Sequence, residues 1–192
     1  MTAGASLPPP WRTRWRVRIG YPVAIACFVL ARPTPLTLAL GGAVAAAGLL
    51  IRGAAAGHLH KHETLATTGP YAWTRNPLYF GSMVLAAGFL LATASWMAAA
   101  LAVIYVFVFY PGVIGREEEE LRAEYGQAFD DYARRVPRFW PRPPQPPAGN
   151  ASEAPTAFSW SQYRRNREYQ ALAGAVFSFV LLAAMMSLWH PR

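Results

Sequence analysis

The sequence predicts an all-α, polytopic membrane protein with about five transmembrane helices. Three observations support this fold class: 54% of the 192 residues are hydrophobic, they gather in long runs with almost no charge, and most basic residues flank those runs. The formal charge is +8, but a nucleic-acid-binding protein would gather its arginines on one folded face beside aromatic residues. We therefore expect one membrane domain over residues 1–192, with the lipid bilayer and not nucleic acid as its surroundings.

The N-terminal part contains the first two predicted spans. Residues 1–10 are Pro-rich and expected to be disordered, whereas Trp11–Arg18 alternates aromatic and Arg residues as membrane-surface segments do. The first apolar run, Ile19–Ala31, is predicted to be a retained helix because its small-x-small triplet lies in the middle of the run and more spans follow. The second run, Leu36–Ala56, has the ~20 residues that a span requires, and its glycines and alanines permit close helix packing.

The third and fourth runs, Leu78–Thr93 and Trp96–Ile114, are separated only by Ala94 and Ser95. This short connection predicts an antiparallel helical hairpin. Pro111 is expected to kink the fourth helix, because proline cannot donate a hydrogen bond to the carbonyl one turn earlier.

A surface helix is predicted at Arg116–Val136, where apolar and aromatic residues recur on one helical face. These residues are Leu121, Tyr125, Phe129 and Tyr132. A Pro-rich linker follows at residues 137–155, and Tyr169–Trp189 is long enough for a fifth span.

The placement of Lys and Arg predicts the orientation in the membrane. With five spans and a cytoplasmic N-terminus, only Arg32 and Arg192 among the 18 basic residues fall on the opposite side. Leu65–Gly81 and Arg116–Pro141 then share the cytoplasmic side, where they can meet. We expect an integral protein of the inner or plasma membrane, if the source is prokaryotic, with its functional site facing the cytoplasm.

The polar and aromatic segment Leu65–Gly81 is the first candidate site. Pro77 is predicted at the first position of the third helix, so Arg75 and Asn76 should lie at a helix N-terminus near the hydrocarbon edge. Backbone N–H groups and the helix dipole favour an anionic or polar ligand group there. A membrane-entry loop with aromatic anchors is the alternative interpretation.

The second candidate is the acidic segment after the fourth run, Glu117–Glu120. A carboxylate at the membrane boundary is costly unless it is solvated or paired. A solvated helix start would explain some of these glutamates, but an inward-facing Glu117 could hold a ligand ammonium or pair with Arg75. His58, His60, His62 and Glu63 are expected to be hydrated loop residues and no metal site is predicted, because a catalytic zinc site needs a further ligand and supporting hydrogen bonds.

These two segments resemble the superfamily of isoprenylcysteine carboxyl methyltransferases and phospholipid methyltransferases, which are integral-membrane enzymes. The resemblance covers about residues 57–141, with an apolar hairpin between two motifs in the same order as in the family. The matching residues are Gly69-Pro70-Tyr71, Arg75-Asn76-Pro77-Leu78-Tyr79-Phe80-Gly81, Glu117-Glu118, Tyr125-Gly126, Tyr132 and Val136-Pro137. One departure is Asn76, where the family usually has His; Asn can form hydrogen bonds but cannot titrate.

The resemblance implies S-adenosylmethionine as methyl donor, bound in a pocket at the cytoplasmic boundary, and a lipophilic small molecule or prenylated acceptor, preferably a carboxylate. Arg75 and Glu117 are the implied catalytic residues, and Arg75 or Arg116 could hold an acceptor carboxylate. The implied cofactor-binding residues are Gly69, Pro70, Tyr71, Arg75, Asn76, Pro77, Tyr79, Gly81, Glu117 and Glu118.

Two other functions remain open on sequence alone. One is a membrane reductase of the sterol type that uses NADPH, whose fold the methyltransferase family resembles. The other is a non-catalytic scaffold whose Pro-rich tail binds a partner. The oligomeric state is not predicted.

Overall fold

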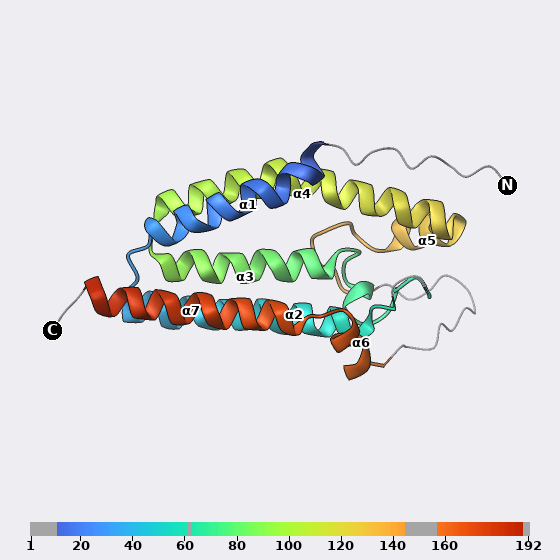
Figure 1. The fold of residues 1–192 in the computed structure, drawn as a ribbon. Helices are drawn as coiled ribbons and strands as arrows, with labels where there is room; N and C mark the ends of the chain where they lie inside the picture. The colour runs from blue at the N-terminus through green and yellow to red at the C-terminus, as the bar shows by residue number, and fades with distance from the viewer. Residues whose placement is uncertain (1–10, 61–62, 145–156, 190–192) are drawn as a thin grey trace.

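The computed structural model describes residues 11–60, 63–144 and 157–189, and every regular element in these ranges is helical (Figure 1). The predicted disordered N-terminus and most of the predicted Pro-rich linker lie outside the described residues. The elements are α1 (Trp11–Val29), α2 (Pro35–His58), the 3-10 helix η1 (Gly69–Ala72), α3 (Pro77–Thr93), α4 (Trp96–Tyr125), α5 (Gln127–Arg135), α6 (Trp160–Arg165) and α7 (Tyr169–Trp189). The predicted all-α class is therefore confirmed.

Among the described helices, three are long and apolar enough to cross a membrane: α2, α4 and most of α7. The helix α3 is apolar but has only 17 residues, which gives about 25 Å of length against about 30 Å of hydrocarbon. The helix α1 joins the Arg-rich segment and the first apolar run in one element of 19 residues, which continues through Pro22. The chain is thus a helical membrane protein, and the number of five spans stays a prediction.

The predicted boundary between the fourth span and a separate surface helix is wrong. The helix α4 runs without a break through Pro111 and the glutamates to Tyr125, over 30 residues. Glu, Leu, Arg and Ala are strong helix formers, so nothing in this sequence stops the helix where its polarity changes. It ends at Gly126, whose φ of +53° suits a residue without a side chain, and α5 starts directly afterwards.

Close packing of α2 on α3 is the most extensive helix contact, and α4 packs chiefly on α1 (Figure 1). The backbones touch at Gly41 and Gly88: a Cβ on Gly41 would lie 2.5 Å from the Gly88 carbonyl oxygen, and one on Gly88 would lie 2.6 Å from that of Gly41. Gly48 and Gly81 form a second such pair, seven residues away along each helix. The predicted close packing by small residues is confirmed, and it fixes the start of α3 against the end of α2.

At the end of the bundle away from η1, short connections join the same helices. Arg32 donates its backbone N–H to the Thr93 carbonyl at 2.7 Å, and Thr34 caps α2 through Thr37. The predicted turn between α3 and α4 is confirmed: Ala94 ends α3 in the left-handed conformation, and the Ser95 hydroxyl accepts the Ala98 N–H. These turns leave the other ends of α2, α3 and α4 together, next to η1 and α5.

Candidate functional site

Two segments far apart in the chain pair along their backbones beside the start of α3. Arg75 donates its N–H to the Pro137 carbonyl at 2.9 Å, and Arg142 donates to the Trp73 carbonyl at 3.0 Å. The Thr74 hydroxyl adds a hydrogen bond of 2.9 Å to the Phe139 carbonyl. The prediction that Leu65–Gly81 meets Arg116–Pro141 is therefore confirmed.

A buried carboxylate on α4 ties these segments together. Glu118 lies 3.3 Å from Arg75 Nη2 through Oε1 and 2.9 Å from Arg138 Nε through Oε2. Its side chain is 12% exposed, so solvent screens these ion pairs only partly. Arg75 thus pairs with Glu118 and not with Glu117. One carboxylate holds the polar segment before α3, the end of α4 and the segment after α5 at the same point.

Asn76 completes this junction as a hydrogen-bond donor. Its side-chain Nδ2 donates to the Arg138 carbonyl at 2.9 Å and approaches Glu118 Oε1 at 3.5 Å. Asn76 immediately precedes Pro77, the first residue of α3, so the predicted position at a helix N-terminus is confirmed. The bonds that Asn76 makes here need an N–H donor and no exchangeable charge, so Asn can make them without titrating.

Two buried tyrosines hold η1 against α5. The Tyr132 hydroxyl donates to the Tyr71 carbonyl at 2.8 Å, and both side chains are almost fully buried. Burial raises the pKa of the Tyr71 and Tyr132 phenols well above the ordinary value for tyrosine. Both hydroxyls therefore stay protonated at neutral pH and can act as donors.

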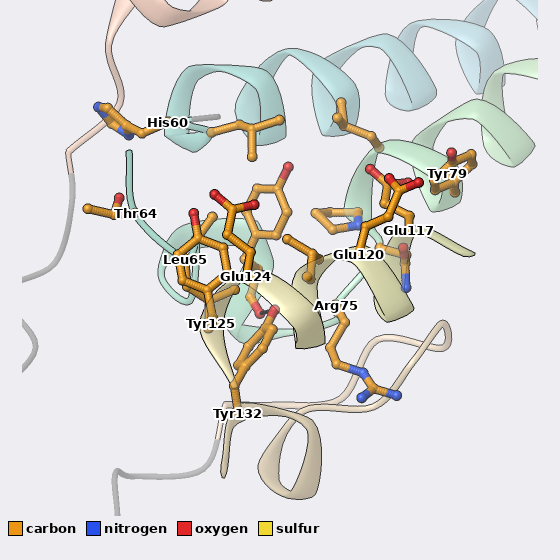
Figure 2. Close-up of a pocket in the computed structure, with 17 residues that line it drawn as sticks. His60, Thr64, Leu65, Arg75, Tyr79, Glu117, Glu120, Glu124, Tyr125 and Tyr132 are labelled. Carbon is orange, nitrogen blue, oxygen red and sulfur yellow. Dashed lines mark hydrogen bonds between the residues drawn. The ribbon is translucent and has the colours of Figure 1, made fainter. Parts of the chain in front are cut away.

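A cavity of about 280 Å³ opens between these elements (Figure 2). Its wall comes from the loop after α2, η1 and the segment that follows it, the start of α3, the last turns of α4, and α5. The lining residues are Leu59, His60, Thr64, Leu65, Ala66, Tyr71, Arg75, Asn76, Pro77, Leu78, Tyr79, Glu117, Glu120, Leu121, Glu124, Tyr125 and Tyr132.

The α4 side of the cavity is acidic. Glu117, Glu120 and Glu124 are spaced three and four residues apart, so they share one face of the helix (Figure 2). Glu120 is also 2.7 Å from Arg116, and Glu117 hydrogen-bonds the Tyr79 hydroxyl. Because adjacent residues of a helix point about 100° apart, Glu118 faces the protein junction while Glu117 faces the cavity.

Arg75 lies across from this acidic face. In Figure 2 its guanidinium points away from Glu117 and toward the segment after α5, which carries Arg138, the other partner of Glu118. Its Nε–H is buried and has no hydrogen-bond partner among the described residues. A buried N–H group without a partner is costly, so this atom adds to the cost of placing Arg75 at the junction.

The predicted cofactor-binding residues divide into two groups. Tyr71, Arg75, Asn76, Pro77, Tyr79 and Glu117 line the cavity. Gly69, Pro70, Gly81 and Glu118 do not line it and instead shape its surroundings. Gly69, for example, has a φ of +59° and lies against the His58 ring, and Gly81 lies against α2.

Sequence reasoning missed several lining residues. The predicted cofactor-binding residues did not include Glu120 and Glu124, although their spacing from Glu117 on an uninterrupted helix would have indicated them. His60 and Leu65 come from the loop after α2, and only the folded chain shows that this loop forms a wall.

The histidines do not form a metal cluster in the part of the chain that the structure describes. In that part, no group of three or more His, Cys, Asp or Glu side chains is placed to hold a metal ion. His58 was predicted in a hydrated loop, but it is the last residue of α2, and its Nδ1 is 2.8 Å from the Ala54 carbonyl. His62 lies outside the described residues.

The division of roles between adjacent glutamates leads to a stability prediction. We expect Glu118→Gln to destabilise the protein by about 2 kcal/mol, because it leaves Arg75 without its charge partner in a largely buried position. Glu117→Gln should leave the melting temperature nearly unchanged. Thermal unfolding of both variants in the same detergent measures this, and an equal loss of stability would contradict the assignment of Glu118 as the structural partner.

The chain is similar to two curated proteins. It is 33% identical over 141 residues to the cobalt-zinc-cadmium resistance protein CzcN of Cupriavidus metallidurans, an alignment that covers 67% of this chain and 62% of that protein. It is 43% identical over 82 residues to the nickel-cobalt-cadmium resistance protein NccN of Alcaligenes xylosoxydans xylosoxydans, which covers 43% of this chain and 38% of that protein. The chain therefore spans less than two thirds of either relative.

No solved structure matches the chain at a significant level. A family model, that of the phospholipid methyltransferases, matches residues 37–128. The matched segment contains α3, nearly all of α2 and all of α4, and thus both the small-residue packing and the acidic wall of the cavity. This match confirms the predicted resemblance of the core of the chain to the phospholipid methyltransferases, a family of integral-membrane proteins.

Proposed function

We propose that this protein is an integral-membrane methyltransferase that uses S-adenosylmethionine and acts on a lipophilic acceptor. The observation that carries the proposal is the acid-lined cavity at the junction of the two family motifs, at the ends of membrane helices. The distribution of Lys and Arg further supports the proposal that this cavity and the N-terminus face the cytoplasm.

The side chains around the cavity suit the chemical groups of the proposed donor. When bound, S-adenosylmethionine supplies a methyl group on a positively charged sulfonium. Glu117, Glu120 and Glu124 offer carboxylates to its positive charges. Tyrosine rings offer stacking surfaces to an adenine. The volume of about 280 Å³ is near the lower end of the roughly 300–1,000 Å³ of small-molecule sites.

The chain's contribution to methyl transfer would be mainly orientation and exclusion of water. Transfer between a donor and an aligned acceptor is a single displacement, which depends strongly on the positions of the reacting groups. Arg75 and Glu117, the two proposed catalytic residues, lie on opposing parts of the cavity wall, and Tyr79 holds Glu117 through a hydrogen bond. Leu59, Leu65 and Leu78 provide apolar surface against which a lipophilic acceptor can lie.

The preferred acceptor, a carboxylate, stays a prediction. Each arginine proposed to hold it has a glutamate partner: Arg75 pairs with Glu118, and Arg116 pairs with Glu120. An acceptor carboxylate would have to share or displace one of these glutamates, whereas a neutral or cationic acceptor would not.

Binding of the donor is the first test. In calorimetric titration of the purified protein with S-adenosylmethionine, we expect Glu117→Gln to weaken binding about tenfold, because it removes a charge-assisted contact worth roughly 1.5–3 kcal/mol. Glu119→Gln is the matched control, since it makes the same change two residues further along α4 and Glu119 does not line the cavity. No binding by the parent protein, or equal binding by both variants, would count against the proposal.

The bond formed on the acceptor can be identified with a labelled methyl group. Membrane lipids and prenylated peptides are incubated with the protein and labelled S-adenosylmethionine, and the apolar product is treated with mild alkali. A carboxylate acceptor gives a methyl ester, so we expect the label to be released as methanol. Label that resists alkali would indicate an amine or thiol acceptor and overturn the carboxylate prediction, and absence of labelled product would contradict lipophilic methylation.

The names of the two relatives suggest a physiological role. We propose that methylation by this chain contributes to resistance against divalent transition metals. In a strain that lacks the chain and is sensitive to cobalt or cadmium, we expect the parent protein and Glu119→Gln to restore growth and Glu117→Gln to fail. Restoration by Glu117→Gln at equal protein level would show that resistance does not depend on the acidic wall.

A further inference from the structure

The segment around α6, which lies outside the family match, packs against the end of α2 and the start of the loop that lines the cavity. Ser159, just before α6, donates its N–H to the Gly57 carbonyl at 3.0 Å. Asn166, just after α6, donates through Nδ2 to the carbonyls of Ala56 and Leu59 at 2.9 and 3.0 Å. These carbonyls belong to the last turn of α2 and to the residue that follows it, where a helix lacks the N–H donors of a further turn, so the segment adds to the C-terminal cap of α2 (Figure 1).

A nearly buried ion pair connects the same segment to two core helices. Arg52 of α2 binds Glu168 through two hydrogen bonds, of 2.6 Å from Nε and 2.9 Å from Nη2, and Glu168 is only 6% exposed. The Nη1 of Arg52 donates to the Ser82 hydroxyl and, at 3.4 Å, to the Leu78 carbonyl, both in α3. A guanidinium held on two edges in this way fixes the relative positions of all three segments.

The backbone just before Glu168 is strained. Arg167 has a φ of +54°, a left-handed conformation that is unfavourable for residues with a side chain. Such a conformation persists only where the surrounding contacts require it. Here it forms the sharp turn between α6 and α7 that directs Glu168 back to Arg52.

The Arg52–Glu168 ion pair and the α6 segment contact the backbone of residues that line the cavity. Leu78, whose carbonyl Arg52 contacts, is a lining residue, and so is Leu59, whose carbonyl Asn166 caps. The charges of Arg52 and Glu168 also act on the buried phenol of Tyr71, a third lining residue. The wall that faces the glutamates of α4 therefore depends on contacts from residues 157–168.

We propose that Glu168 is a positioning residue for the ligand site: through Arg52 it fixes the first turn of α3, and together with the α6 contacts it sets the cavity wall opposite Glu117. The ligand named in the test, S-adenosylmethionine, rests on the proposed function. The positioning itself does not, because it can be observed in the ligand-free protein.

The test compares Glu168→Gln with Arg165→Gln. Arg165 of α6 forms an exposed ion pair with Glu63 at 2.6 Å, so it joins the same two regions without burial and serves as the matched control. In the ligand-free protein, we expect Glu168→Gln to speed amide hydrogen exchange at least fivefold in residues 54–60 and 78–82. We also expect affinity for S-adenosylmethionine to fall about tenfold. Arg165→Gln should change neither.

A double variant separates positioning from general stability. Arg52→Gln/Glu168→Gln removes the unpaired charge that Glu168→Gln leaves behind, so its melting temperature should return toward that of the parent. Because the link to α3 is still missing, exchange should stay fast and affinity low. Parent-like exchange in either variant, or recovery of affinity together with stability, would overturn the proposal. Absence of binding by the parent would contradict the proposed function, and the exchange rates would still decide the positioning role.

Discussion

The site depends on one buried carboxylate. Glu118 pairs with Arg75 and Arg138 and lies near the Asn76 amide, so it joins three segments that are distant in sequence. An unpaired carboxylate in this position would be costly, and the largely buried Arg75 without its partner would add to the cost. Folding therefore favours the arrangement in which the segment before α3, the end of α4 and the segment after α5 meet. The cavity exists because these segments meet there.

The continuity of α4 then determines which glutamate is free. Since the helix passes unbroken from the apolar region to Tyr125, its rotation places Glu118 toward the junction and Glu117, Glu120 and Glu124 toward the cavity. The opposite wall has a separate support. Glycine-mediated contact of α2 with α3 sets the distance between these helices, and Arg52 with Glu168 fixes their ends. The ligand-facing residues are therefore held by contacts made outside the cavity.

Much of this arrangement could be predicted from local sequence features. Length and polarity identified the long helices, Pro77 marked the start of α3, and the distribution of basic residues predicted that the two motifs can meet. The directions in which Glu117 and Glu118 point could not be predicted, because they depend on the continuity of α4. From the sequence, the fourth helix was expected to end at Ile114. The partnership of Arg52 with Glu168 was also out of reach, since 116 residues separate them and only tertiary packing brings them together.

A structure of the protein with bound S-adenosylmethionine tests the central claim most directly. The account predicts the ligand in the cavity between η1 and α4, with Glu117 and Tyr71 in contact with it and Glu118 still paired with Arg75 and Arg138. A ligand bound elsewhere, or one that contacts Glu118 while Glu117 faces solvent, would contradict the separation of a structural from a ligand-facing glutamate.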